Sequence, residues 1–327
     1  MTEHLLITGG AGFIGSHLAD RWLAEGGAVT VLDDLSTGRV ENLRAAARHP
    51  RLRFEQGSVL DRRRVRRLVE EVDLIAHLGA VVGVRRVCER PLETLRVNAG
   101  GSEVLLEAAA ELGRPTLVAS SSEVYGASPR LPYREEQELG YGSPEIPRWS
   151  YAASKAAAES NALAHHEASG LEVRIVRFFN TSGPRQRPNS GMVLPRMVAR
   201  ALAGEPLVIY GDGQQSRCFC HVRDTVEAVV RLMREPRANG KVFNVGSARE
   251  VSIEQLAELV QQRVGRKVGV ERRPYAEDFG ADFVDTRRRV PCLARLRDAI
   301  HFEPATPLER LVDDVCADLS ASMGAPR

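Results

Sequence analysis

Two side chains in the segment Trp149-Ser-Tyr-Ala-Ala-Ser-Lys155 have types and spacing that suit proton transfer. Tyr151 and Lys155 are four residues apart, so on a helix they lie on one face, one turn apart. A tyrosine hydroxyl has a pKa of about 10 and is a poor base at neutral pH. A nearby ammonium stabilises the phenolate, so we predict that Lys155 lowers the pKa of Tyr151 toward the working range. Lys155 is one of only three lysines in a chain with 42 arginines, which strengthens the pairing.

A dinucleotide-binding pattern opens the chain. The apolar run 4–8 leads into glycines 9, 10, 12 and 15, and a predicted amphipathic helix follows at 13–26. Glycines permit a tight turn and close approach of the backbone to a pyrophosphate, which lies at the positive end of the helix dipole. Asp33 ends the next predicted strand, 28–32, eighteen residues after Gly15. A carboxylate there accepts hydrogen bonds from both adenine-ribose hydroxyls and repels a 2′-phosphate, which favours NAD over NADP.

Strands and helices then alternate. We predict strands at 51–56, 74–78 and 115–120 and helices at 62–71 and 99–112. This alternation predicts an α/β fold with a Rossmann-type doubly wound parallel sheet. After Asn180 the pattern loosens into loops and shorter elements, which indicates a smaller α/β substrate-binding C-terminal domain. Ligands of such sheets bind at the carboxyl ends of the strands, so the polar residues 120–126 should point into the cleft.

Taken together, these motifs resemble those of the extended short-chain dehydrogenase/reductase superfamily, in its nucleotide-sugar epimerase, dehydratase and decarboxylase branch. Further shared motifs are Arg177-Phe-Phe-Asn180, Gly183-Pro-Arg185 and the run from Gly211 to Phe219. The resemblance implies NAD as the cofactor. It implies cofactor contacts from Gly9, Gly12, Phe13, Ile14, Gly15, Asp33, Leu35, Thr37, Gly38, Ser58, Val59, Leu78, Gly79, Ala80, Asn98, Tyr151, Lys155 and Phe179.

Residues 121–123 bear on the reaction. By resemblance, Ser121 hydrogen-bonds the C4 oxygen of the sugar. The 4,6-dehydratases carry an Asp-Glu pair next, whereas here Ser122 replaces the aspartate, which disfavours dehydration. Ser122-Glu123 is the pairing of the UDP-glucuronate decarboxylases, and the runs after Arg217 and around 285–291 are similar to theirs. The implied catalytic residues are Tyr151, Lys155, Ser121, Glu123, Ser122 and Arg217.

The implied reaction begins with oxidation at C4. The resulting ketone lies β to the C6 carboxylate and loses carbon dioxide readily. Hydride return would give UDP-xylose, and early release of NADH would give the UDP-4-keto-pentose. Residues 129–148 depart from the xylose-forming type, so a 4-epimerase acting on UDP-glucuronate or a UDP-hexose stays open.

We predict an NAD-binding domain at 1–180, with returns near 222–246, and a nucleotide-sugar-binding domain at 181–327. The resemblance places the UDP-sugar against Asn180, Arg185, Val193, Leu194, Val208, Tyr210, Arg217 and Arg289. A guanidinium suits a phosphate or a carboxylate because it can donate two parallel hydrogen bonds.

Composition excludes several other classes. A formal charge of +2 is too small to indicate nucleic acid or a membrane surface as a partner. No apolar run reaches the roughly 18 residues of a membrane span. The five cysteines and eight histidines lack metal-ligand spacing. We therefore expect a metal-free cytoplasmic protein with reduced thiols, and the resemblance implies a homodimer through the helices at 99–112 and 151–168.

Overall fold

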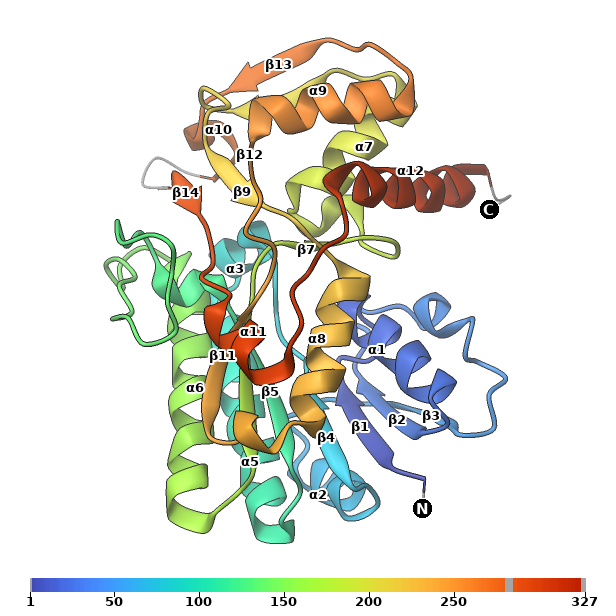
Figure 1. Ribbon diagram of the computed structural model, residues 1–327, viewed down its shortest axis with the longest axis vertical. Helices are drawn as coiled ribbons and strands as arrows, with labels where there is room; N and C mark the ends of the chain where they lie inside the picture. The colour runs from blue at the N-terminus through green and yellow to red at the C-terminus, as the bar shows by residue number, and fades with distance from the viewer. Residues whose placement is uncertain (1, 280–284, 325–327) are drawn as a thin grey trace.

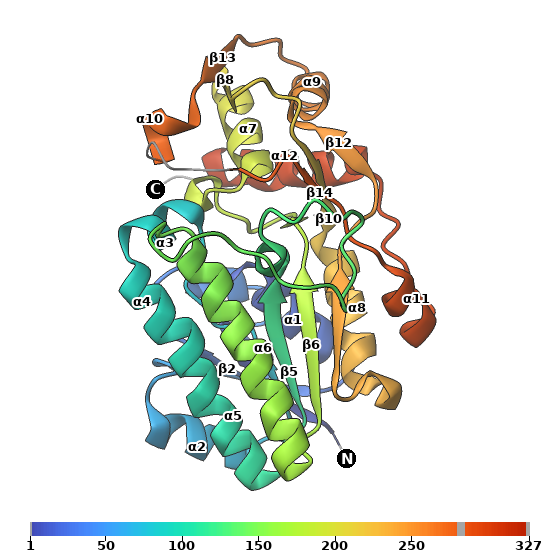
Figure 2. The same ribbon diagram turned by 90° about the vertical axis from the view of Figure 1, so that its left-hand side faces the viewer.

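The computed structural model describes residues 2–279 and 285–324. Among these residues, one sheet has seven parallel strands in the order β11-β6-β5-β4-β1-β2-β3 (Figures 1 and 2). Its strands are β1 His4–Thr8, β2 Ala28–Asp33, β3 Leu52–Gln56, β4 Leu74–His77, β5 Thr116–Ser121, β6 Val173–Phe178 and β11 Lys241–Val245. The order reverses between β1 and β4, where ligands of such sheets bind. The predicted Rossmann-type doubly wound sheet is confirmed.

Helices cover both faces of this sheet (Figure 2). Helices α1 Phe13–Ala24 and α8 Val222–Arg234 pack on one face, and α2 Arg62–Glu70, α5 Gly101–Leu112 and α6 Trp149–Ser169 on the other. Successive residues of β1 enter different cores: Leu5 and Ile7 join the α1–α8 core, and Leu6 joins the other. Burial on both faces explains why this strand is an unbroken apolar run in the sequence.

The predicted helix at 99–112 corresponds to α5, but the helical segments that precede it were not predicted. The chain forms α3 Val84–Glu89, then α4 Pro91–Leu95, then the π-helical turn η2 Arg96–Gly100, and only then α5. Pro91 starts α4 because the first helical position needs no backbone N–H. The other elements predicted in this half lie within two residues of their expected bounds.

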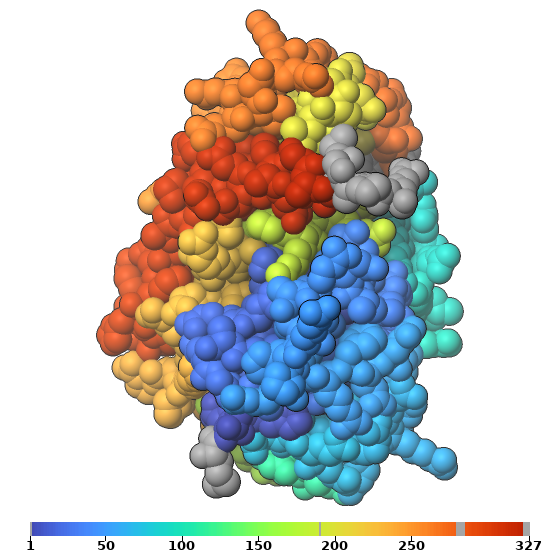
Figure 3. All heavy atoms as spheres, turned by 90° about the vertical axis from the view of Figure 1, so that its right-hand side faces the viewer, coloured from blue at the N-terminus to red at the C-terminus, as the bar shows by residue number. Residues whose placement is uncertain are grey.

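A second group of elements packs beyond the carboxyl ends of the strands (Figure 1). Helices α7 Val193–Ala203, α9 Ile253–Val264 and α12 Leu308–Gly324 enclose a separate apolar core with β8 Leu207–Tyr210. In the space-filling view of Figure 3, the red and orange C-terminal residues lie over the blue N-terminal ones. Between these cap elements the chain returns to the main sheet, where β11 pairs with β6.

Short strands connect the cap to the sheet. Strand β9 Ser216–Cys218 pairs with β12 Glu250–Ser252 and β14 Arg288–Arg289, and β7 Thr181–Ser182 with β10 Cys220–His221. In the β9–β14 pair, Arg217 lies directly opposite Arg289. The remaining elements are η1 Val40–Leu43, η3 Ser122–Tyr125, η4 Pro188–Ser190, η5 Pro236–Ala238, β13 Val270–Arg273, α10 Tyr275–Phe279 and α11 Ala294–Ile300.

Candidate active site

The glycine loop joins β1 to α1 by close backbone contacts. Gly9 has φ +69°, and its N–H donates to the carbonyl of Leu32 at 2.8 Å. A Cβ on Gly9 would lie 2.8 Å from backbone atoms of Gly79, and one on Gly15 would clash with the carbonyl of Gly9. Gly12, the N-cap of α1, offers no capping side chain, so the first N–H groups, those of Phe13 and Ile14 included, lack an acceptor within the helix. A pyrophosphate fits this cradle.

The carboxylate of Asp33 ends β2 beside this loop. It accepts hydrogen bonds from the backbone N–H groups of Ala11 at 3.0 Å and Leu35 at 2.8 Å. A Cβ on Gly38 would lie 2.8 Å from both carboxylate oxygens, so the loop through Thr37 and Gly38 closes on Asp33. Burial raises the pKa of Asp33, and the two backbone bonds oppose that effect. Each oxygen keeps a second lone pair, which suits two ribose hydroxyls.

Buried His77 positions the loop that follows β4. Its ring nitrogens lie 2.8 Å from the Thr8 hydroxyl and 3.0 Å from the Ser102 hydroxyl. The Thr8 oxygen also accepts the N–H of Gly79 at 3.1 Å, which fixes the predicted cofactor loop 78–80. Burial, helped by the charge of Lys155, lowers the pKa of His77 to about 3, so the ring is neutral. Sequence reasoning placed His77 in a strand and missed this role.

Asn98 lies in the π-helical turn η2 and is 1% exposed. Its amide exchanges two hydrogen bonds with the backbone of Val81, at 2.7 and 3.1 Å, and donates a third to Ser154 at 3.2 Å. The Ser154 hydroxyl donates to the carbonyl of Tyr151 at 2.7 Å. Asn98 therefore ties the loop after β4 to α6. Its direct contact with the cofactor stays a prediction.

Tyr151 and Lys155 both belong to α6. Lys155 is 3% exposed, and its ammonium donates to the carbonyl of Ala119 on β5 at 2.8 Å. Burial lowers the pKa of Lys155 to about 8, opposed by the charge of Glu159. Burial raises the pKa of Tyr151 to about 12, although a hydrogen bond with Ser121 lowers it. The predicted lowering of the Tyr151 pKa is therefore wrong. Desolvation of the Tyr151 hydroxyl outweighs the contacts that stabilise its phenolate.

A buried polar network lies beneath this pair. Glu159, one turn after Lys155, receives two hydrogen bonds from the guanidinium of Arg177, at 2.8 and 2.7 Å, and another from Ser120. Arg177 also donates to the hydroxyl of Tyr125 at 2.8 Å. Sequence reasoning did not assign Glu159 a role, although it extends the four-residue spacing of Tyr151 and Lys155.

Glu123 lies between two arginines at the start of η3. Its carboxylate pairs with Arg289 at 2.7 Å and with Arg148 at 3.3 Å. Burial alone would raise the pKa of Glu123, but the charges of Arg289 and then Arg148 prevail and lower it to about 2. Glu123 is therefore a carboxylate at neutral pH, unable to donate a proton. Ser122, which follows Ser121, is 2% exposed, and its catalytic contact stays a prediction.

Arg217 is a further charged residue near Glu123. It pairs with Asp285 at 2.7 Å, and the hydroxyl of Tyr275 donates to the same carboxylate at 2.7 Å. Burial lowers the pKa of Arg217, and so does the charge of Arg289 opposite it, while Asp285 raises it. The structure thus brings together the predicted residues Ser121, Glu123, Tyr151, Arg217 and Arg289.

Four other predicted residues contact other parts of the protein, and their contacts with cofactor or substrate stay predictions. Leu194 and Phe179 are fully buried within apolar clusters. Arg185 pairs with Asp20 of α1 at 2.6 Å and so bridges the cap and the sheet. Tyr210 stacks on Tyr275, with ring centroids 5.4 Å apart. The contacts predicted for Ser58, Val59, Asn180, Val193 and Val208 stay predictions.

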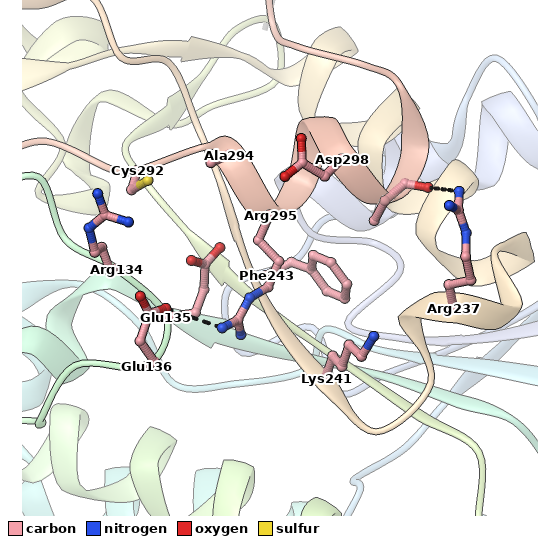
Figure 4. A pocket seen from close by; sticks show the side chains of 11 residues that line it. Arg134, Glu135, Glu136, Arg237, Lys241, Phe243, Cys292, Ala294, Arg295 and Asp298 are labelled. Carbon is pink, nitrogen blue, oxygen red and sulfur yellow. Dashed lines mark hydrogen bonds and ion pairs between the residues drawn. The ribbon is translucent and has the colours of Figure 1, made fainter.

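A hollow of about 430 Å³ lies outside this site, beside the edge strand β11. Figure 4 shows two of its charged side chains bound to protein partners: Arg295 lies 3.1 Å from Glu136, and Arg237 donates to the carbonyl of Ala299 at 2.8 Å. None of the predicted site residues lines it. Within the described ranges, no group of three or more His, Cys, Asp or Glu could hold a metal ion. No helix there is long and apolar enough to cross a bilayer.

Comparison with known proteins gives consistent matches. A sequence model of the NAD dependent epimerase/dehydratase family matches residues 5–246. A UDP-N-acetyl-α-D-glucosaminuronate decarboxylase of Bacillus cytotoxicus is 36% identical over 313 residues, 95% of either chain. UDP-glucuronic acid decarboxylase 1 of Xenopus tropicalis is 36% identical over 307 residues, which are 94% of this chain and 70% of that protein.

Among solved structures, a UDP-N-acetylglucosamine 4-epimerase from Methanobrevibacter ruminantium, in complex with UDP-N-acetylmuramic acid, has the same fold. The TM-score is 0.89 at 29% identity, and the match covers 99% of this chain and 100% of that one. All of these matches agree with the resemblance read from the motifs.

Proposed function

The chain belongs to the NAD dependent epimerase/dehydratase family, and from this premise we propose that it decarboxylates a UDP-uronate after oxidising C4 of the sugar. One observation supports this choice over dehydration: Glu123 is held ionised between Arg148 and Arg289, and the charges of Glu123 and Arg289 both act on the pKa of Tyr151. A carboxyl group in that state cannot serve as the acid of a dehydration. The names of the two decarboxylase relatives support the same choice.

NAD is the cofactor. The backbone cradle at Gly9 and Gly12 would hold its pyrophosphate, and Asp33 would hold the adenine ribose. When bound, NAD supplies a cationic ring that accepts the C4 hydride and can return it.

Tyr151 is the base that removes the proton from the C4 hydroxyl. At a pKa of about 12 the hydroxyl is protonated at rest, so turnover requires the phenolate to be stabilised. The hydrogen bond with Ser121 and the charge of Arg289 both act in that direction. Lys155, anchored to the carbonyl of Ala119, holds its ammonium on the same face of α6.

Once the C4 ketone has formed, loss of carbon dioxide leaves an enolate on the same oxygen. Hydrogen bonds from Ser121 and Tyr151 would stabilise that oxygen by about 3–4 kcal/mol each, as oxyanion-hole donors do. The ionised Glu123 would destabilise the C6 carboxylate or order the water that reprotonates C5. The product is UDP-xylose or the UDP-4-keto-pentose.

The preferred substrate is UDP-glucuronate. Its 2-acetamido counterpart is a second candidate because the Bacillus cytotoxicus relative is named for it. A 4-epimerase acting on UDP-glucuronate or a UDP-hexose is the alternative reaction, favoured by the solved 4-epimerase of the same fold. In both reactions the same groups oxidise C4, and the two differ in whether the C6 carboxylate leaves.

The cap elements within 181–327 are proposed to hold the uridine diphosphate, with Arg217 toward the diphosphate or the sugar. We also propose a homodimer through α5 and α6. Leu92 and Leu95 on the adjoining α4 are 69% and 40% exposed, and a second copy packed on this side would bury them. A cytoplasmic location stays a prediction drawn from the five free cysteines.

Mass spectrometry of the nucleotide sugars tests the proposed reaction. The purified protein is incubated with NAD and, in separate reactions, with UDP-glucuronate, UDP-N-acetylglucosaminuronate and UDP-glucose. Loss of carbon dioxide from a uronate, with none from UDP-glucose, is expected. A new isomer of unchanged mass, resolved by chromatography, would instead identify an epimerase.

A further inference from the structure

Three consecutive residues at the end of β5 each contact one of three residues of α6. The three pairs are Ala119 with Lys155, Ser120 with Glu159, and Ser121 with Tyr151. The α6 residues are four apart, so their side chains lie on one face of the helix, one turn from each other. The proposed mechanism uses the first and the third pair. The second pair, which brings in the carboxylate of Glu159, takes no part in that mechanism.

The carboxylate of Glu159 is fixed in a buried position. Its side chain is 6% exposed and receives two hydrogen bonds from the guanidinium of Arg177, at 2.8 and 2.7 Å. The hydroxyl of Ser120 donates to the same carboxylate. A two-point bond to a guanidinium holds a carboxylate in one orientation. The negative charge of Glu159 therefore has a fixed place, one turn after Lys155.

Burial works against the charge of Lys155. This residue is 3% exposed, and its ammonium donates to an uncharged group, the carbonyl of Ala119, at 2.8 Å. Burial lowers the pKa of Lys155 to about 8, and the charge of Glu159 opposes this fall. Without that carboxylate, a larger share of Lys155 would be an uncharged amine at neutral pH.

Three other titratable groups around Lys155 carry no negative charge. Tyr151, one turn before it, is a protonated phenol at neutral pH, and His77 of β4 has a neutral ring. Arg177 of β6 is a cation bound to Glu159. The Tyr151 phenolate that turnover requires is stabilised by a protonated lysine and not by a neutral amine. The carboxylate of Glu159 is thus well placed to support proton transfer.

From this geometry we propose that Glu159 is a positioning residue for the proton transfer at C4: acting through Lys155, its fixed carboxylate keeps the buried ammonium charged beside Tyr151. This inference rests on the proposed function and deepens it, since it gives a part in the reaction to a residue outside the motif of Tyr151 and Lys155. Glu159 acts through another residue because its own contacts are with Arg177 and Ser120.

The scarcity of lysine gives a direct readout. Lys155 shares the chain with only two other lysines, Lys241 and Lys267, and both are exposed. Lysine labelled with carbon-13 at Cε therefore gives three signals, and their titration is followed by nuclear magnetic resonance in the NAD-loaded protein. Glu159→Gln removes the charge and keeps the shape of the side chain. We expect it to lower the pH at which Lys155 loses its proton by about 1–3 pH units relative to the wild type.

Further variants separate the effect of charge from that of folding. Glu159→Gln leaves the charge of Arg177 unpaired, which destabilises the fold. The double variant Glu159→Gln/Arg177→Met removes both charges and should show the same fall for Lys155. Glu159→Asp keeps a carboxylate and should recover part of the wild-type value. Glu167→Gln, at an exposed position of the same helix, is the matched control and should leave the titration unchanged.

The pH dependence of hydride transfer gives a second readout. NADH formed in a single turnover of the sugar nucleotide that the protein accepts is followed by its absorbance. The rate should fall on the alkaline side as Lys155 loses its proton, and this alkaline limb should move to lower pH in Glu159→Gln. A merely structural role would move neither the limb nor the lysine signal.

An unchanged Lys155 titration in Glu159→Gln and in the double variant would overturn the inference, and so would an alkaline limb that stays in place. If Glu159→Gln does not fold, the double variant decides. Movement of the Lys155 signal in a protein that epimerises UDP-glucuronate would refute the proposed decarboxylation and leave the role of Glu159 standing, because both reactions begin with oxidation at C4.

Discussion

The ammonium nitrogen of Lys155 lies 2.8 Å from the carbonyl oxygen of Ala119. Ala119 belongs to β5 and Lys155 to α6, so this bond fastens the helix that carries Tyr151 to the strand that ends at Ser121. Ser121, the last residue of β5, forms a hydrogen bond with Tyr151 of the same helix. The proposed proton transfer at C4 therefore depends on the register between one helix and one strand.

Replacement of Tyr151 by phenylalanine removes only the hydroxyl that exchanges the C4 proton. Turnover should fall by about 100- to 10,000-fold, the usual range for general acid–base catalysis, with NAD affinity unchanged. Steady-state kinetics and NAD titration measure the two effects. Tyr141→Phe, at a tyrosine that is 39% exposed, is the control. Retained turnover in Tyr151→Phe would refute the assignment.

Asp33 should decide between NAD and NADP. Asp33→Asn removes the negative charge but keeps a side chain that can hydrogen-bond. We expect the ratio of NAD to NADP affinity to fall by about 10- to 100-fold, because charged hydrogen bonds to the ribose are lost and the repulsion of the 2′-phosphate disappears. Asp34→Asn, at the exposed neighbour, should keep the wild-type ratio. Fluorescence titration with both cofactors measures it, and an unchanged ratio in Asp33→Asn would contradict this assignment.

The buried pair of Glu159 and Arg177 should contribute strongly to the stability of the folded protein. The side chains of Arg177 and Glu159 are 4% and 6% exposed, so loss of one partner leaves a buried, unpaired charge. Arg177→Met should lower the free energy of unfolding by about 3–5 kcal/mol. The double variant Glu159→Met/Arg177→Met should lose less than the sum of the single variants.

Urea denaturation measures these losses. Arg263→Met, which breaks the exposed pair with Asp313, is the control and should cost about 1 kcal/mol or less. Additive losses at Glu159 and Arg177 would show that the two side chains act independently.

His77 should make the fold sensitive to acid. Its folded pKa of about 3 lies below the value of about 6.5 in the unfolded chain. Below pH 6.5 the unfolded chain therefore binds a proton that the native ring does not, and this lowers the free energy of unfolding by about 1.4 kcal/mol per pH unit as pH falls toward 3.

Between about pH 6 and pH 4, the free energy of unfolding of His77→Gln should fall less steeply with decreasing pH than that of the wild type, by that amount. Denaturation at a series of pH values measures the difference, and equal slopes for wild type and His77→Gln would show that the ring titrates normally.

Local signals made much of this fold predictable from the sequence. The run 4–8, the glycine loop and Asp33 are close in sequence, and the four-residue spacing of Tyr151 and Lys155 needs only a helix. Residues that depend on distant partners were missed or misjudged. Arg148 has no periodic pattern in an arginine-rich chain, and its partner Glu123 is 25 residues away. The Tyr151 pKa was misjudged because the burial of a hydroxyl depends on tertiary packing.

The fate of the C6 carboxylate is the central question. UDP-glucuronate labelled with carbon-13 at C6 is incubated with the NAD-loaded protein and followed by nuclear magnetic resonance. Our account predicts that the label leaves the sugar and appears as carbon dioxide and bicarbonate, in step with the UDP-pentose or its 4-ketone. If the label stays in a UDP-sugar whose C4 configuration has inverted, the enzyme is an epimerase and the decarboxylation is refuted.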